Sequence, residues 1–161
     1  MDFAGYTIDT PELSLKGIQT LARVVSVYDG DTMTLVIPFK GDCYKFNCRL
    51  AGIDTCEIKS KVQKNKDTAV QARNRLLQLM GLDVKELNAA YTRSQIQKML
   101  SDTVTLVNID CYDFDKYGRV LVDVYDKTRT TNIVRCLLEE KLAYKYDGTT
   151  KLTEDQQFEL L

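Results

Sequence analysis

The sequence predicts an α+β fold in which a five-stranded Greek-key β-barrel carries three flanking helices and a short helical insertion before the fourth strand. Three observations support this prediction. Valine-rich segments separated by turn signals fill the first third of the chain. A segment with helical periodicity follows, and two further strand-like segments then precede two helix-like ones.

The first three strands are expected at residues 20–28, 32–39 and 43–52, as a meander. Asp29-Gly30 supplies the first turn, and the second falls at residues 40–42. Phe46, Cys48 and Leu50 share one face of the third strand because strand side chains alternate with a period of two.

Beyond a lysine-rich loop the period becomes helical from Ala69 to Met80, and Gly81 is expected to end that helix. A capping box at Thr92–Gln95 opens a short helical segment, and a weaker one occurs at residues 83–86. Strands are expected at 104–111 and 119–125, and helices at 131–142 and 153–161.

The predicted element order, β-β-β-α-β-β-α-α, matches the barrel called the OB-fold, with an open α+β sandwich as the alternative. Residues 1–18 have no clear period and are predicted to be an irregular N-terminal arm, so the domain spans 19–161. The fold alone does not fix a function, because OB-folds bind oligonucleotides, sugars and proteins.

Composition excludes several function classes. The net charge of −1 argues against a protein that coats nucleic acid through many phosphate contacts. Histidine is absent, so Ser-His-Asp and Cys-His hydrolysis are excluded, and carboxylates would have to handle both metal and proton. The five cysteines are odd in number and lack zinc spacing, so free thiols are expected.

The expected location is intracellular, because the acidic start does not resemble a signal peptide and the cysteine count is odd. No apolar run is long enough for a membrane span, so no membrane contact is expected, and a monomer is the default expectation. Four lysines crowd residues 59–66, where a solvated loop is the ordinary interpretation.

Three short segments concentrate carboxylates and arginines, and each also has an ordinary structural interpretation. Asp31 follows a hairpin turn and is either a simple exposed acid or a hard oxygen ligand. Arg119 follows the turn Asp115–Gly118, where its guanidinium is suited to bidentate phosphate contact.

The remaining segment, residues 49–57, is either a surface ion-pair cluster or a catalytic one. Arg49 and Asp54 have opposite parity in a regular strand, but a kink at Gly52 would bring them to one side. Asp54 would then bind a metal while Glu57 faces a water and accepts its proton. Together the three segments supply what phosphodiester hydrolysis needs: a bound cation, an activated water and a phosphate clamp.

The segments YDGDTMTL, RLAGIDTCE, DKYGRVLVDVY and LAYKY resemble, in order and character, the signature segments of staphylococcal (micrococcal) nuclease and its thermonuclease-like relatives. The resemblance covers roughly Thr20 to Tyr146. It implies an OB-fold, a single Ca²⁺, and endo- and exonucleolytic cleavage of DNA and RNA to 3′-phosphate products.

The resemblance also implies residue roles. Calcium ligands are the carboxylates of Asp31 and Asp54 and the backbone carbonyl of Thr55, and the general base is Glu57. Arg49 and Arg119 correspond to the phosphate-binding pair. Contacts to the nucleotide fall on Lys116, Tyr117, Tyr144 and Tyr146.

Three departures from the family pattern are visible. Cys56 stands where the family usually has proline, which predicts a less rigid, oxidisable loop. Extra residues lie between Leu79 and Val104, and the final helix is shorter. The alternative reading is a catalytically inactive OB-fold module that binds nucleic acid or protein, as in Tudor-containing proteins, and a third is a scaffold with a structural calcium site. We favour the active nuclease because Asp31, Arg49, Asp54, Glu57 and Arg119 are all present.

Overall fold

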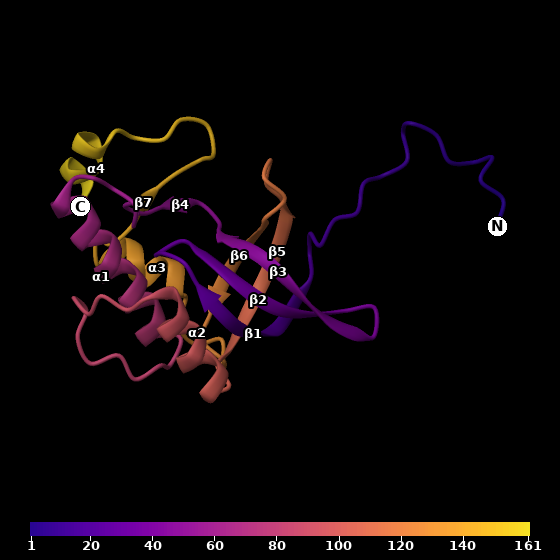
Figure 1. The fold of residues 1–161 in the computed structure, drawn as a ribbon. Helices are drawn as coiled ribbons and strands as arrows, with labels where there is room; N and C mark the ends of the chain where they lie inside the picture. The colour runs from indigo at the N-terminus through magenta and orange to yellow at the C-terminus, as the bar shows by residue number, and fades with distance from the viewer.

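The computed structural model describes residues 1–161 and has a closed barrel of five strands flanked by four helices (Figure 1). The barrel strands are β1 (Gln19–Val27), β2 (Thr32–Phe39), β3 (Asp42–Leu50), β5 (Leu106–Phe114) and β6 (Val120–Tyr125). Around the barrel they run in the order β1-β2-β3-β6-β5, and β5 returns to β1. The predicted OB-type α+β fold is therefore confirmed.

Strand pairing follows the predicted meander. β1 pairs antiparallel with β2, and β2 with β3. β3 and β6 run parallel, with Cys48 opposite Val120, and this pairing closes the barrel across the long connection between the halves of the chain. A β-bulge between Val24 and Ser26 bends β1, as barrel strands require where they curve.

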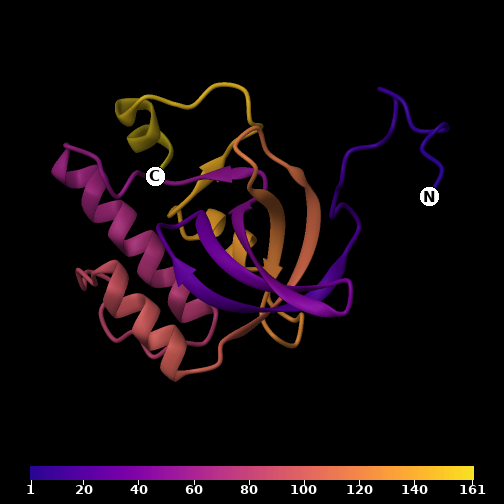
Figure 2. The ribbon, with the colours of Figure 1, turned by 45° about the vertical axis from the view of Figure 1, so that its right-hand side comes forward.

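The helices lie mainly along one side of the barrel (Figure 2). They are α1 (Gln63–Leu79), α2 (Arg93–Asp102), α3 (Ile133–Glu139) and α4 (Glu154–Leu160). Thr92 forms the predicted capping box of α2. Thr153 forms a capping box at α4, and Asn132 caps α3 by accepting a hydrogen bond from the Arg135 backbone N–H. Gly81 follows α1 with a φ of 102°, the left-handed conformation that suits glycine at a helix end.

The helices differ from the sequence prediction in three places. α1 begins at Gln63, so Lys64 and Lys66 lie on its first turn rather than in a loop. The weaker capping signal at residues 83–86 forms no helix, because Leu82 and Val84 turn into the core from an irregular segment. α3 ends at Glu139, before the predicted limit of residue 142.

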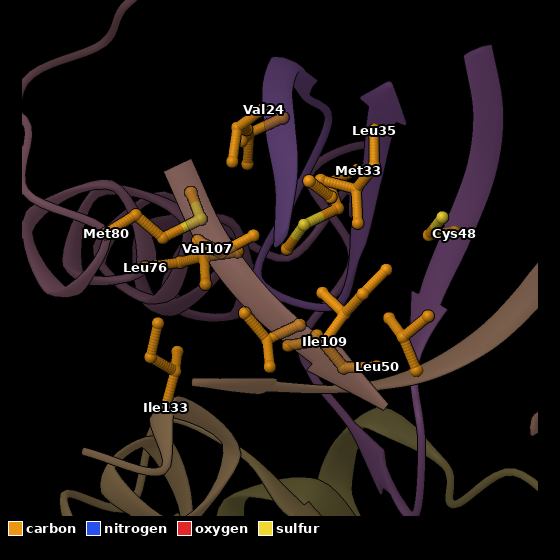
Figure 3. Packing of buried hydrophobic residues seen from close by; sticks show 14 of the residues in the cluster. Val24, Met33, Leu35, Cys48, Leu50, Leu76, Met80, Val107, Ile109 and Ile133 are labelled. Atoms are coloured by element: carbon orange, nitrogen blue, oxygen red, sulfur yellow. The ribbon is translucent and has the colours of Figure 1, made fainter. Parts of the chain in front are cut away.

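The hydrophobic core fills the barrel and continues under the helices. Side chains of the barrel, such as Val24, Leu35 and Ile109, meet Leu76 from α1 and Ile133 from α3 (Figure 3). The barrel and the helices therefore share a single core. Because α1 and α3 pack into this core, the loops next to these helices are held in fixed positions relative to the barrel.

Two further features complete the fold. A small second sheet pairs β4 (Ile53–Asp54) with β7 (Tyr144–Lys145), which the sequence did not predict, and Ile53 packs in the core. Residues 1–18 contain no helix or strand; Leu15 is buried in the core, and the exposed residues before it reach away from the body (Figure 1). No helix has the length and apolar character needed to cross a membrane. All five cysteines are free thiols, as predicted.

Candidate nuclease site

The three predicted segments meet at one end of the barrel because of strand register. Thr32 at the start of β2 pairs with Arg49 near the end of β3, which places Asp31 beside Arg49. Arg49 in turn pairs with Leu121 of β6, which places Arg119 and the turn before it on the next strand. Residues that are 88 positions apart in the sequence therefore surround one site.

The predicted kink after β3 is present. Gly52 has a φ of 76°, a conformation that glycine adopts without strain, and the chain turns back through β4. Arg49 then reaches the turned segment: Nη1 donates to the Ile53 carbonyl at 2.7 Å and Nη2 to Asp54 Oδ1 at 3.0 Å. Arg49 and Asp54 consequently lie on the same side, as the sequence analysis expected.

Asp31 and Thr55 are joined directly. Asp31 Oδ2 accepts hydrogen bonds from the Thr55 backbone N–H at 3.0 Å and from its hydroxyl at 3.2 Å, and it lies 3.7 Å from Arg49 Nη2. Asp54, with 1% of its surface exposed, accepts a hydrogen bond from the Tyr144 hydroxyl. The β4–β7 pairing makes this last contact, because Asp54 lies opposite Tyr144.

Burial and mutual repulsion change the acidity of these carboxyl groups. Burial and the neighbouring Asp31 carboxylate raise the pKa of Asp29 to about 8. Burial, together with Asp31, also raises the pKa of Asp54 above its ordinary value. Burial opposes ionisation of Asp31 as well, but Arg49 and several hydrogen bonds outweigh it and lower its pKa.

The donor set fits a hard divalent cation. Asp31 and Asp54 are buried carboxylates close enough to influence each other's ionisation, and both face Arg49. Oxygen donors of this kind are what Ca²⁺ prefers. No group of three or more acidic, histidine or cysteine side chains is placed to hold an ion. A cation here would complete its shell with a backbone carbonyl, water and substrate oxygens.

The turn before β6 holds Arg119. Asp115 accepts hydrogen bonds from the backbone N–H groups of Tyr117 and Arg119 and from Arg119 Nε, the last at 2.8 Å. The guanidinium stacks near the Tyr117 ring, 5.4 Å from its centre. The predicted turn therefore also fixes the direction of the arginine.

A cavity of about 530 Å³ lies between this turn and the segment after β7. Its size falls within the range of small-ligand sites. Four cationic side chains line it, together with two tyrosines: Arg49, Lys116, Arg119, Lys151, Tyr117 and Tyr146. A cavity with several cations and accessible aromatic rings, of which Tyr117 is exposed and Tyr146 half-buried, suits a phosphorylated nucleoside.

The two remaining tyrosines predicted to contact the nucleotide differ in position. Tyr146 lines the cavity and lies under Arg49, with the guanidinium 5.3 Å from the ring centre. Tyr144 is buried, points at Asp54 and is not among the residues that line the cavity. The structure therefore places Tyr144 behind the carboxylates.

Glu57 lies at the edge of the site, and its carboxylate accepts a hydrogen bond from Lys151 Nζ at 2.9 Å. Sequence reasoning missed Lys151, because a lone lysine in a polar loop has no local signal. It also treated Asp29 only as a turn residue, although Asp29 is buried beside Asp31. The neighbouring Gly30 was the available sequence signal for a buried turn, because glycine allows the chain to pack closely against other elements.

The loop residue Cys56 is fully buried, and Asn65 Nδ2 lies 3.9 Å from its sulfur. Burial raises the pKa of the Cys56 thiol to about 11. Because thiolates rather than thiols react with oxidants, this structure gives no support to the expected oxidisable loop.

A family model described as staphylococcal nuclease homologue matches residues 47–161 of the chain. The match includes every predicted site residue except Asp31. A comparison with curated proteins finds no match.

Proposed function

Because the chain belongs to the staphylococcal nuclease homologue family, we propose that it is a calcium-dependent nuclease that hydrolyses phosphodiester bonds of DNA, RNA or both to 3′-phosphate products. One observation carries the proposal. Arg49 and Arg119 line one cavity, and Arg49 also contacts the buried carboxylates of Asp31 and Asp54. Lys151, which lines the same cavity, is paired with the exposed carboxylate of Glu57.

Asp31 and Asp54, with the Thr55 carbonyl, would hold the calcium ion. When bound, the ion supplies positive charge that stabilises the negative charge developing on the phosphate. Tyr144 supports the site from behind by donating its hydroxyl hydrogen to Asp54. A hydrogen bond of this kind orients a ligand carboxylate.

Arg49 and Arg119 are placed to bind the phosphate oxygens. Backbone carbonyls and Asp54 hold Arg49, and Asp115 holds Arg119, so neither group has to reorganise when charge develops. Electrostatic stabilisation is most effective when the donors are fixed in advance.

Glu57 is the proposed general base. Its carboxylate accepts a proton from the attacking water while the water oxygen forms a bond to phosphorus. The bond from phosphorus to the 5′ oxygen breaks, and that oxygen takes a proton from solvent. The products are a 3′-phosphate and a 5′-hydroxyl. Tyr117, 72% exposed, offers a ring on which a base can stack, and Lys116 lies beside it.

The test is a cleavage assay on single- and double-stranded DNA and RNA, with Ca²⁺, with Mg²⁺ and with chelator. We expect cleavage with Ca²⁺ and none with chelator. If the 5′ ends of the cleavage products accept a label without prior removal of a phosphate, they carry a 5′-hydroxyl, which would support the assignment of 3′-phosphate products. Full activity in excess chelator would refute the calcium role, and substrate binding with no cleavage under any condition would favour the inactive module.

Variants of the acidic residues assign the roles. Asp54→Asn should weaken calcium binding while the domain stays folded. Glu57→Gln should lower turnover by roughly 10²- to 10⁴-fold while the substrate still binds. Glu86→Gln is the matched control, since Glu86 is exposed and lies in the irregular segment before α2. Unchanged turnover in Glu57→Gln would show that another group accepts the proton.

A further inference from the structure

Lys151 places an ammonium group among the acidic residues of the site. It belongs to the segment that joins β7 to α4. Its Nζ lies 2.9 Å from Glu57 Oε1 and 3.5 Å from Asp54 Oδ1. The lysine therefore bridges the proposed general base and a proposed calcium ligand.

Asp54 Oδ1 has two cationic neighbours, and they are held very differently. Arg49 is buried and also donates to the carbonyls of Leu50 and Ile53. The Lys151 side chain is 52% exposed, and its only hydrogen bond is to Glu57. A lysine ammonium sits on a flexible stem of four carbons. Of the two cations, Lys151 is consequently the one that is free to leave the carboxylates.

We propose that Lys151 competes with the divalent cation for Asp54 and Glu57 and thereby sets the metal affinity of the site. The inference rests on the proposed function, because it assumes that Asp54 is a metal ligand. In the metal-free protein the ammonium balances charge on the two carboxylates. Binding of a divalent cation beside Asp54 repels the ammonium and releases Glu57.

The position of Lys151 gives this exchange a consequence for catalysis. The ammonium occupies Oε1 of Glu57, one of the two oxygens with which this carboxylate could accept a proton from water. Release of Lys151 frees that oxygen and so links metal binding to the base. Lys151 also lines the cavity that contains Arg49 and Arg119, so its charge remains beside the phosphate position after release.

The experiment measures binding of Ca²⁺ alone, by calorimetry, to the wild-type chain and three variants. Lys151→Gln removes the ammonium and should bind calcium about tenfold more tightly, an effect discounted for the solvent exposure of the pair. Lys151→Arg keeps the charge and should stay close to wild type. Lys98→Gln is the matched control, because it breaks an exposed Lys98–Asp102 pair on α2 with the same change in net charge.

A second readout is thermal unfolding in chelator and in calcium. Lys151→Gln should unfold at a lower temperature than wild type in chelator, because Asp54 and Glu57 lose a counter-ion. It should gain more than wild type from calcium, since ligand stabilisation rises with affinity. A protein that merely lost structure would bind calcium more weakly and would gain less.

The outcomes separate the inference from the proposed function. Calcium binding by wild type without tighter binding by Lys151→Gln overturns the inference alone. No calcium binding by any of the four proteins overturns both. Calcium binding by Lys151→Gln but not by wild type would support the inference in its strongest form.

Discussion

At the scale of single residues, the two arginines of the site are fixed in different ways. Arg49 is buried and also supports the kink after β3, so its replacement would disturb the backbone as well as the proposed phosphate contact. Arg119 is held by Asp115, lies beside the Tyr117 ring and borders the cavity. Arg119 therefore gives the cleaner test of phosphate recognition.

We predict that Arg119→Lys lowers kcat by roughly 10²-fold, in the range found when one donor to a developing oxyanion is removed. Lysine keeps the charge but loses the planar group that can contact Asp115 and a phosphate oxygen together. Steady-state kinetics at saturating calcium and fixed salt measure the effect, with kcat separated from KM.

Arg135→Lys serves as the control, because Arg135 is an exposed arginine on α3 paired with Glu139. It should change neither kcat nor KM. If Arg119→Lys raised KM and left kcat unchanged, Arg119 would bind substrate and transition state equally, and its proposed role in stabilising the transition state would be wrong.

At the scale of elements, the site depends on how the β1–β2 turn packs against α1. A methyl group added at Gly30 would lie 2.8 Å from Cβ of Ala72 in α1 and 2.9 Å from Cγ2 of Thr55. Both distances are shorter than side-chain carbon atoms tolerate. Gly30 therefore lets the turn approach α1 closely enough for Asp31 to meet Thr55.

We predict that Gly30→Ala destabilises the fold by about 1–3 kcal/mol, the usual cost of overpacking. It should also weaken calcium binding, because the turn can relieve the clash only by moving Asp31 away from Thr55. Urea unfolding and calcium calorimetry measure the two effects. Gly5→Ala is the control, since nothing lies within 4 Å of the methyl group at that position. Unchanged calcium affinity in a destabilised Gly30→Ala would show that Asp31 does not move.

Sequence periodicity predicted the barrel well where a strand buries one face, as the alternation in β2 and β6 shows. β3 departs from this pattern, because its first four residues are exposed and its last three are all buried. It missed the β4–β7 sheet, since two-residue strands have no period to detect. The contact between Arg49 and Asp54 was predictable, because a glycine lies between them and allows the kink. The contacts of Lys151 were not predictable, because they depend on how the segment between β7 and α4 packs against the site.

At the scale of the whole molecule, the region matched by the family model is not the folding unit. The match begins at residue 47, whereas β1 and β2 complete the barrel before it and the turn between them contains Asp31. Without β1, neither β2 nor β5 would have its second neighbour. The contribution of the N-terminal arm, residues 1–18, is a separate matter, and the predicted boundary near residue 19 stays a prediction.

The arm divides into two parts with different expected effects on stability. Leu15 is buried in the core, and the backbone beside it exchanges hydrogen bonds with Cys111 of β5. Phe3 and Tyr6 are exposed and face mainly each other, with ring centres 6.1 Å apart.

We predict that Leu15→Ala lowers the free energy of unfolding by about 2–4 kcal/mol, as expected for a large-to-small change in a core. Removal of residues 2–12 should change the free energy of unfolding by less than about 0.5 kcal/mol and should leave the proposed nuclease activity unchanged, because every residue of that segment is exposed. Urea unfolding of the three proteins, followed by fluorescence of the tyrosines, measures both effects. A loss of more than about 1 kcal/mol on removing residues 2–12 would show that the outer arm packs on the domain in solution.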